Sequence, residues 1–417
     1  MILDMDLTGI SWVRLTFVDV FGASHSVNIP ASRFASAVEF GEPFDGSSLE
    51  GRARLAETDM RLLPDPETLV LLDDGVATAN CIVLDTQGAP WPGDPRTALL
   101  SVIEQTGALG ATYTASPELE FYLLDADGKP VDAGGYFEDT AGVGAMVVRE
   151  AVDRLADCGV EVESTHHEAG PGQYEIDLAP LPALQFADAL VLTKFILRDT
   201  AAQAGLRATF MPRPFAGEAG SGLHIHQRTV SGLVEETGEL TEEGRFFMGG
   251  QLAHARALSA LAAPTVNSYK RLHSGPEAPS AIVWAFVNRG ALIRLSPNVV
   301  GGPTIEFRGA DPSANPYLVV AGLLIAAAHG VGESIDPPAA FEEEIGSFDP
   351  AAIDSARAEL LPRNLDEALD SLLLDDVLSD AFEPQLLQLL VDGRRAEATA
   401  YSEQVTPWET ERYLDGA

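Results

Sequence analysis

Apolar and polar residues alternate through SPELEFYLLD, residues 116 to 125, with the period of two that is typical of a β-strand. The apolar side chains at 119, 121 and 123 point to one face of that strand, and those of Glu118, Glu120 and Tyr122 point to the other. Two carboxylates on one strand face repel each other unless water or a positive charge lies beside them. A solvated surface strand and a cation site both explain this pattern, and only the rest of the chain can distinguish them.

The first 90 residues have the pattern of short strands. WVRLTFVDV and SHSVNIP flank a Phe21-Gly22-Ala23 turn and predict a hairpin, and TLVLLD and NCIVLD predict two further strands. A Pro- and Gly-rich stretch, QGAPWPGDP, then ends in Asp94 and Pro95, which predict the cap and first turn of a helix through RTALLSVIEQTG. We therefore expect one domain over residues 1–90 and a second over residues 91–417.

Longer segments beyond that boundary have the apolar spacing of helices, at about 143 to 158, 182 to 204, 244 to 262 and 314 to 330. Short strands separate these helices, and the last 70 residues are predicted to be helical. This order of elements is typical of a mixed α and β catalytic body. A chain of 417 residues is also too long for one ordinary hydrophobic core, which agrees with two domains.

The charge of the chain excludes some partners. Sixty-three acidic against 26 basic residues give a net charge of -37, which repels nucleic acid and anionic membrane surfaces. The first residues lack the pattern of a targeting segment, and the longest apolar run, 317 to 328, is too short to span a bilayer. Cys81 and Cys158 have no metal-site or disulfide spacing, and we expect buried free thiols in a cytoplasmic protein.

Three further segments carry ionisable side chains on predicted strands. HHEAGPGQYEIDL, 166 to 178, places Glu168 and Glu175 on either side of a Gly-Pro-Gly turn. GEAGSGLHIHQ, 217 to 227, runs from a Gly and Ser loop into a strand on which two histidines share a face, and PTIEFRGADP, 303 to 312, places a glutamate and an arginine two residues apart. Each segment alone is also explained by a core histidine or a surface ion pair. These last two segments contribute His224, His226, Glu306 and Arg308.

The recurrence of such segments predicts a metal centre. Burying so many carboxylates without cations would be prohibitive. Carboxylates outnumber imidazoles and no thiolate joins them, which favours Mg²⁺ or Mn²⁺ over zinc, and six candidate ligands suit two ions bridged by phosphate. Guanidinium groups bind phosphate and carboxylate oxygens, and an arginine set follows in the same part of the chain: Arg271, Arg289, Arg294 and Arg308. For a single arginine of this set, an ion pair with a surface carboxylate is the alternative.

At this point the chain resembles the glutamine synthetase family, in its bacterial and archaeal type I class. The resemblance extends over nearly the whole chain, and its motifs occur in the family's order: FDGSSLEG, ETDMRLLPDPET, PELEFYL, GGYF, HHEAGPGQYEIDL, TFMPRPFAGEAGSGLHIHQ, PTVNSYKRL, NRGALIRL and IEFRGADPSANPYL. It implies an α+β fold with a small β-grasp amino-terminal domain and a catalytic domain whose antiparallel sheet forms a half-barrel surrounded by helices. It also implies a homo-oligomer, usually a dodecamer, with active sites between subunits.

The resemblance assigns roles to the candidate residues by position. It implies one metal site of Glu120, Glu168 and Glu175 and another of Glu118, His224 and Glu306. The glutamate substrate would be held by Arg271 and Arg308, with Gly220 available beside it, and the ATP phosphates by Arg289 and Arg294, of which Arg294 also assists catalysis. An ammonium pocket would comprise Asp45, Ser48 and Tyr136, with Glu277 on a closing loop that helps to deprotonate the amine, and the nucleotide would be contacted by Glu163 and His226.

These roles imply an ATP-dependent glutamate-ammonia ligase that acts through a γ-glutamyl phosphate. The chain departs from the family pattern at Ala219, where the family has an asparagine, and at GGPT, 301 to 304, where the family has basic residues. Two alternatives therefore remain open. One is a γ-glutamyl ligase that uses an organic amine or polyamine, and the other is a weakly active homologue.

Overall fold

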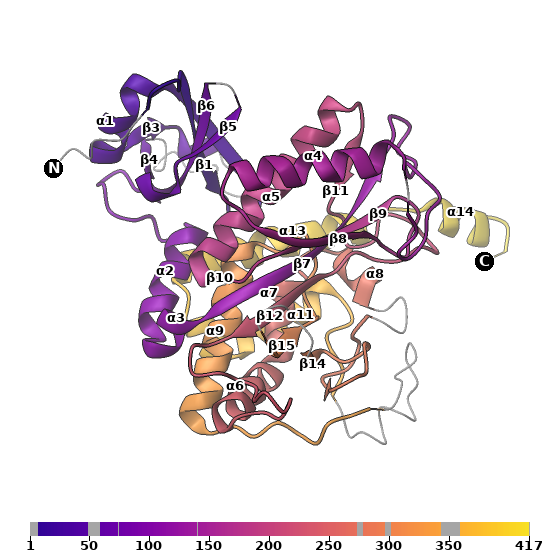
Figure 1. The fold of residues 1–417 in the computed structure, drawn as a ribbon. Coiled ribbons are helices and arrows are strands. Elements are labelled where there is room, and N and C mark those ends of the chain that lie inside the picture. The colour runs from indigo at the N-terminus through magenta and orange to yellow at the C-terminus, as the bar shows by residue number, and fades with distance from the viewer. Residues whose placement is uncertain are drawn as a thin grey trace.

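The computed structural model describes residues 7–48, 59–73, 75–139, 141–272, 278–296, 302–342 and 359–416, and its strands form two sheets (Figure 1). The amino-terminal sheet has the strand order β2-β1-β6-β4-β3, with β5 paired to β6. The pair β1 and β6 is parallel, and the other pairs are antiparallel. These strands, with the helix that follows β2, are β1 (Trp12–Val18), β2 (Ser24–Pro30), α1 (Phe34–Phe40), β3 (Glu42–Phe44), β4 (Met60–Pro64), β5 (Val70–Asp73) and β6 (Val76–Leu84).

The second sheet runs in the order β13-β14-β15-β12-β7-β9-β8, with β10 and β11 also paired to β7. All of its pairs are antiparallel except that of β13 with β14. Its longest strand, β7 (Thr114–Leu124), is the one that the alternation of SPELEFYLLD predicts. The others are β8 (Val162–His167), β9 (Gln173–Leu178), β10 (Leu181–Pro182), β11 (Arg207–Thr209), β12 (Leu223–Arg228), β13 (Trp284–Ala285), β14 (Ile293–Ser296) and β15 (Thr304–Phe307).

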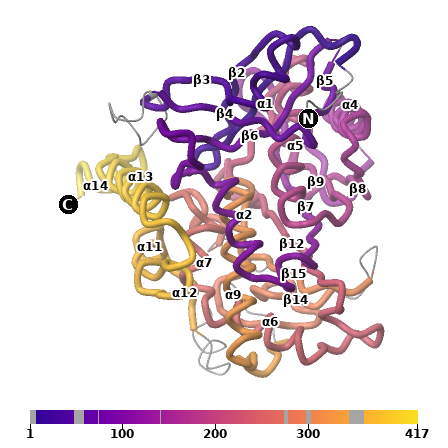
Figure 2. The backbone as a smooth tube through the Cα atoms, turned by 90° about the vertical axis from the view of Figure 1, so that its left-hand side faces the viewer, coloured from indigo at the N-terminus to yellow at the C-terminus, as the bar shows by residue number. Residues whose placement is uncertain are grey.

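Helices surround the second sheet, and those nearest the carboxyl end lie together along one side of the body (Figure 2). They are α2 (Pro95–Gln105), α3 (Ala108–Thr112), α4 (Val143–Asp157), α5 (Ala183–Gln203), α6 (Glu242–Ala253), α7 (Ala255–Ala262), α8 (Ser268–Leu272), α9 (Pro316–Glu333), α11 (Leu365–Leu374), α12 (Asp376–Asp380), α13 (Pro384–Ser402) and α14 (Pro407–Tyr413). The α+β class with a β-grasp sheet and a curled catalytic sheet is confirmed.

Most sequence predictions of individual elements are confirmed. The β1–β2 hairpin turns at Gly22, whose φ of 86° a glycine adopts without strain. Asp94 caps α2 by accepting a hydrogen bond from the amide of Thr97, as its position before Pro95 predicts. The prediction of one continuous helix over 244 to 262 was wrong. The segment 244 to 262 is broken at His254, because that residue leaves helical geometry and its ring bonds Asp375 and His329.

Buried ionic contacts join the amino-terminal sheet to the body. The guanidinium of Arg96 on α2 donates to Asp65, just after β4, at 2.8 Å and to Asp188 on α5 at 2.9 Å. The Tyr317 hydroxyl on α9 donates to the same Asp188 carboxylate at 2.6 Å. One guanidinium thus bonds a carboxylate of each part of the chain and connects the two parts. The domain boundary near residue 91 itself stays a prediction.

Helix α9 is the central packing element of the body. It is long and apolar enough to cross a membrane by length and composition, but 72% of it is buried inside the protein. It packs against α2, α5, α6 and α7. Both cysteines are free and buried, which confirms the prediction of unpaired thiols for the described residues.

Candidate active site

Strand register brings the candidate ligands onto one face of the second sheet. On β7, Glu118 lies opposite His224 of β12 and opposite Asp177 of β9, while Glu120 lies opposite Glu175 of β9. At the next pair of strands, Glu306 of β15 lies between a histidine of β12 and an arginine of β14, at the register positions of His226 and Arg294. Because side chains alternate between faces, matched positions on neighbouring strands point the same way.

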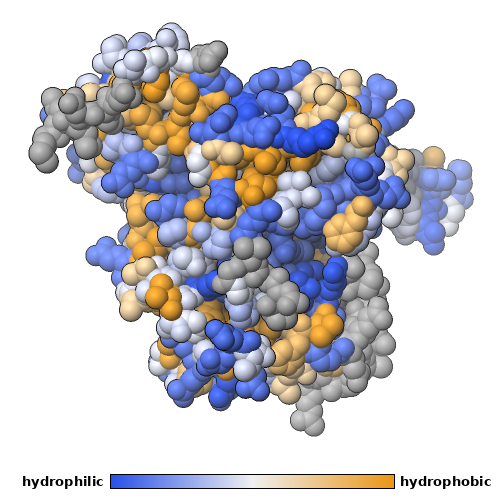
Figure 3. Space-filling view, in the orientation of Figure 1, coloured by the Kyte–Doolittle hydropathy of each residue, from blue (hydrophilic) through white to orange (hydrophobic). Residues whose placement is uncertain are grey.

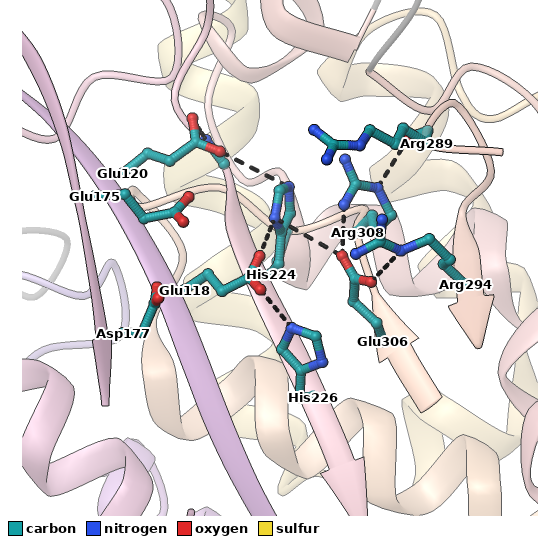
Figure 4. A network of polar contacts seen from close by, with 12 residues as sticks. Glu118, Glu120, Glu175, Asp177, His224, His226, Arg289, Arg294, Glu306 and Arg308 are labelled. Atoms are coloured by element: carbon teal, nitrogen blue, oxygen red, sulfur yellow. Dashed lines mark hydrogen bonds and ion pairs between the residues drawn. The ribbon is translucent and has the colours of Figure 1, made fainter. Parts of the chain in front are cut away.

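The first group of possible metal ligands is Glu118, His224 and Glu306, with one donor atom from each within 4.8 Å of the others. His224 Nδ1 lies 2.8 Å from a Glu118 oxygen and 3.9 Å from a Glu306 oxygen (Figure 4). Burial by itself would raise the pKa of Glu118, but hydrogen bonds with His224 and His226 hold it well below its usual range. Glu118 therefore remains a carboxylate, which is the form that binds a metal.

The second group is Glu120, Glu175 and His224, again with donor atoms within 4.8 Å. Burial raises the pKa of Glu120, and the charge of Arg271 only partly opposes it. Burial and the neighbouring charge of Glu120 raise the pKa of Glu175 well above its usual range. These two carboxylates face each other with no cation between them among the described residues, and a bound cation would relieve that repulsion.

Glu168 joins the site through a third group, in which His166, Glu168 and Glu175 lie within 4.8 Å of one another. His166 Nε2 lies 2.9 Å from a Glu175 oxygen, and Nδ1 of the same ring lies 3.7 Å from Glu168. Glu168 also accepts a hydrogen bond from the amide of Ala169 at 2.9 Å, which orients its carboxylate. All six predicted ligands are thus brought together.

The donor set fits hard divalent cations. It consists of carboxylate oxygens and the imidazoles of His166 and His224, without a thiolate, and this composition favours Mg²⁺ or Mn²⁺ over softer metals. A further carboxylate, Asp177, points toward the same group, and its Oδ1 is buried without a hydrogen-bond partner. Burial raises the pKa of Asp177 to about 6. A buried oxygen without a hydrogen-bond partner, next to carboxylates that repel one another, is expected in a site that needs additional positive charge.

Arginines form the wall opposite the carboxylates. Glu306 is held between Arg294, whose Nε donates at 2.6 Å, and Arg308, whose Nη1 donates to the other oxygen (Figure 4). Burial would raise the pKa of Glu306, but the charge of Arg308 outweighs it and lowers the pKa to about 2. Arg271 is fixed by donating to the carbonyls of Ala310 and Arg308 at 2.9 and 3.1 Å. Guanidinium groups held this firmly suit the binding of anionic oxygens.

These two walls enclose a cavity of about 630 Å³. Its lining includes Arg271, Arg289, Arg294 and Arg308 on one side and the carboxylates on the other. Gly222 permits this close approach, because a Cβ there would lie 2.8 Å from both Arg271 Nη2 and His224 Nε2. Gly220 also lines the cavity, and Tyr136 lies at its edge, 3.4 Å from a guanidinium nitrogen of Arg289. The volume suits a small ligand with a phosphate chain.

Other predicted site residues lie elsewhere. Among the described residues, Asp45, Glu163 and His226 do not line the cavity, and neither does the fully buried Glu306. Asp45 is exposed on the amino-terminal domain, where it accepts two hydrogen bonds from Ser47. His226 is buried behind Glu118 and bonded to it at 2.7 Å. The side chain of Ser48 and all of Glu277 lie outside the described residues. The roles of these residues, like those of the predicted residues that line the cavity, stay predictions.

Sequence reasoning missed three residues of the cavity region. Asp177 follows Glu175 by two positions on β9 and so had the same alternation signal that singled out Glu118 and Glu120. Gln173 donates from its side chain to Glu120 at 3.1 Å and to the Gly220 carbonyl at 3.1 Å. His166 bonds Glu175 only because β8 pairs with β9 in this register, and the local sequence carries no sign of that pairing.

Comparisons with known proteins find one family over both parts of the chain. The family model described as "Glutamine synthetase, catalytic domain" matches residues 92–413, and that described as "Glutamine synthetase, beta-Grasp domain" matches residues 9–85. A glutamine synthetase of Halobacterium salinarum is 39% identical over 99% of this chain and 95% of its own length. One of Thermotoga maritima is 38% identical over 97% and 96%.

Solved structures show the same fold. A structure titled "GmaS/ADP complex-Conformation 1" superposes with a TM-score of 0.87 at 30% identity, over 98% of this chain and 97% of that one. A cryoEM structure of Plasmodium falciparum glutamine synthetase has a TM-score of 0.87 at 23% identity, over 98% and 97%. At 23% identity, the Plasmodium falciparum structure supports the fold alone.

Proposed function

This chain belongs to the glutamine synthetase family, and we propose that its cavity joins ammonia to the γ-carboxylate of glutamate at the expense of ATP. The protein is an ATP-dependent carbon-nitrogen ligase. One observation carries the proposal: a cavity lined by repelling carboxylates on one wall and by arginines on the other. Such a cavity suits a substrate that brings cations and phosphates together.

The metal ligands would be the two sets given by the family resemblance. They are Glu120, Glu168 and Glu175 for one divalent ion and Glu118, His224 and Glu306 for the other, with Mg²⁺ or Mn²⁺ as the ion. The second set is one of the groups described above, and in the first set Glu175 is grouped once with Glu120 and once with Glu168. Bound divalent cations would supply neutralisation of the charge that gathers on the transferring phosphoryl group. Arg294 and Arg308 both form ion pairs with Glu306.

The reaction would proceed in two steps. An oxygen of the glutamate γ-carboxylate takes the γ-phosphoryl group of ATP, which gives ADP and γ-glutamyl phosphate. Ammonia then attacks the γ-carbonyl carbon with its lone pair, phosphate leaves with the electrons of the broken carbon-oxygen bond, and one N–H proton passes from the new amide nitrogen to the leaving phosphate, which gives glutamine and hydrogen phosphate. Arg271 and Arg308 would hold the glutamate, while Arg289 and Arg294 would bind the phosphates.

Ammonia has to be captured and deprotonated before it attacks. Tyr136, at the cavity edge, would form part of the ammonium pocket, which Asp45 and Ser48 of a neighbouring subunit would complete. Glu277 would accept a proton from the ammonium ion. Glu163 and His226 would contact the nucleotide. In this arrangement the enzyme is a homo-oligomer, a dodecamer by family analogy, located in the cytoplasm.

An organic amine is the second candidate for the acceptor, and Ala219 is the observation that favours it. Its backbone carbonyl accepts the Tyr122 hydroxyl at 2.7 Å, and its methyl group lines the cavity. A side chain this small leaves more room at the cavity wall than the asparagine usual in the family. The substrate test below decides between the two acceptors.

The test is release of phosphate from ATP with glutamate and a panel of amines: ammonium, methylamine, ethylamine and putrescine. We expect turnover with ammonium to exceed that with every organic amine at least tenfold, because the proposed pocket recognises a small cation. Turnover with an organic amine in place of ammonium would transfer the assignment to the second candidate. Turnover with none of them would contradict ligase activity.

Glu120→Gln is the matched variant, because it preserves the size of a carboxylate that accepts from the Gly222 amide at 2.9 Å. We expect its phosphate release to fall at least a hundredfold, since the amide has no charge for a cation. Glu104→Ala, on the exposed face of α2, serves as the control and should leave turnover unchanged. Full activity in Glu120→Gln would contradict the ligand role.

A further inference from the structure

A second cavity, of about 270 Å³, lies where the amino-terminal sheet meets the body. Strands β1 and β6 form one wall, and α5 and the turn between α4 and β8 form the other. Figure 3 shows apolar residues gathered over the amino-terminal sheet and on the body beside it. None of the residues that line this junction cavity lines the candidate active site. The junction cavity is therefore a separate feature, to which the proposed ligase reaction assigns no role.

Arg14 of β1 is the cation of the junction cavity. Its guanidinium lies over the ring of Phe195, 4.3 Å from the ring centroid. Among the described residues its side chain has no hydrogen bond and no ion pair, although acids outnumber bases 63 to 26 in the chain. Burial lowers the pKa of Arg14, and the charge of Asp199 opposes this shift. Asp199 itself is paired with Arg154 at 2.8 Å, so Arg14 lacks a carboxylate of its own.

The acids near this cavity do not compensate Arg14. The Asp188 carboxylate, which lines the cavity, accepts from Arg96 at 2.9 Å and from the Tyr317 hydroxyl at 2.6 Å. Glu67 lies exposed at the rim. A partly buried guanidinium without an anion is unfavourable, and a ligand carboxylate that bonds its N–H edge would restore the balance.

The rest of the wall is mainly apolar. It includes Val70, Val160, Leu181, Leu192 and Phe195. The hydroxyls of Thr16 and Thr78 bond each other at 3.0 Å and so satisfy one another. An occupant therefore needs a compact apolar body in addition to one anionic end. An inorganic anion would leave most of this apolar surface facing water.

We propose that the junction cavity binds a small organic monocarboxylate with a compact apolar body, its carboxylate bonded to Arg14 and its body packed against Phe195 and Leu192. The occupant would contact the amino-terminal sheet and α5 at once. It would also lie beside the turn Pro66–Thr68. The residue before this turn is Asp65, whose carboxylate accepts a hydrogen bond from Arg96. Its binding would stabilise the junction between the two parts of the chain.

Isothermal titration calorimetry with benzoate, benzyl alcohol and acetate tests this site. Benzyl alcohol has the same apolar ring without the charge, and acetate has the charge without the ring. We expect benzoate to bind at least tenfold more tightly than either. If the unmodified chain bound benzoate and benzyl alcohol with equal affinity, or did not bind benzoate, the proposal would be wrong. This result does not depend on how any variant behaves.

Arg14→Gln locates the binding. We expect it to weaken benzoate at least tenfold and to leave benzyl alcohol unchanged, while Arg207→Gln, an exposed arginine on β11, changes neither. If benzoate bound Arg14→Gln as tightly as it binds the unmodified chain, its binding site would lie elsewhere, for instance at the arginines of the active site. The proposal would then be wrong. The measurement involves no turnover, so its failure is distinct from failure of the proposed ligase function.

Discussion

Lys194 on α5 shows at the scale of one residue how burial next to the site shifts a titration. Its ammonium donates to the Pro312 carbonyl at 2.6 Å, four residues beyond Arg308. Burial lowers the pKa of Lys194 to about 7 from an ordinary value of 10.5. The unfolded chain therefore keeps this proton at pH values where the folded chain has lost it, and stability rises with pH between those two values.

We expect the unfolding free energy of the wild type to rise by about 1 to 2 kcal/mol relative to Lys194→Met between pH 7 and pH 9. Urea denaturation at both pH values measures this difference, and the subtraction removes the contributions of all other groups. Lys129→Met, on an exposed turn, is the control and should show a constant difference. Parallel pH curves for wild type and Lys194→Met would contradict the shift.

Individual site residues could be predicted where a short sequence pattern determines which face they occupy. Alternation placed Glu118 and Glu120 on one face of β7, and β9 places Glu175 beside Glu120. The same rule, applied to Asp177, would have added it. It could not reveal His166, because that contact depends on a pairing between strands that only the folded chain shows.

At the scale of elements, α6 and α9 cross with their backbones in contact. A Cβ on Gly330 of α9 would lie 2.2 Å from the Phe246 carbonyl, and one on Gly250 of α6 would lie 2.1 Å from the Ala326 carbonyl. Real Cβ atoms do not approach so closely, so any side chain at either position has to push the helices apart. The crossing was not predictable, since glycines inside a helical pattern also occur without such contacts.

We expect Gly330→Ala to lower the free energy of unfolding by about 1 to 3 kcal/mol, because the added methyl group overpacks this crossing. Gly332→Ala is the matched control two residues further along α9, where nothing lies within 4 Å of the added Cβ. It should be neutral or more stable by up to about 1 kcal/mol. Urea denaturation of both variants gives the comparison, and equal stability of the two would contradict the packing argument.

At the scale of the whole molecule, helix α14 has no buried residue. The helix begins with a capping box between Thr406 and Glu409. Trp408 and Tyr413 on the helix and Leu414 directly after it are exposed at 60%, 51% and 75%. Copies of a chain with a net charge of -37 repel one another, so the proposed homo-oligomer needs contacts that oppose this repulsion. An exposed helix with large apolar side chains at one edge of the body is suited to such a contact (Figure 1).

We expect the double variant Trp408→Ala and Leu414→Ala to form a smaller assembly than the wild type. Light scattering after size-exclusion chromatography measures the molar mass. Val230→Ala, at a turn where the side chain is 83% exposed, is the control and should leave the mass unchanged. An unchanged mass in the double variant would show that α14 does not hold the oligomer together.

The central position of β7 also bears on how the chain is made. Glu118 leaves the ribosome 106 residues before His224, its partner across the β7–β12 pair. At roughly 5 to 20 residues per second, this gap lasts on the order of 5 to 20 seconds. Throughout that interval one edge of the longest catalytic strand is open to other nascent chains. We therefore expect that edge to be the part of β7 at which a nascent chain is most exposed to pairing with another chain during translation.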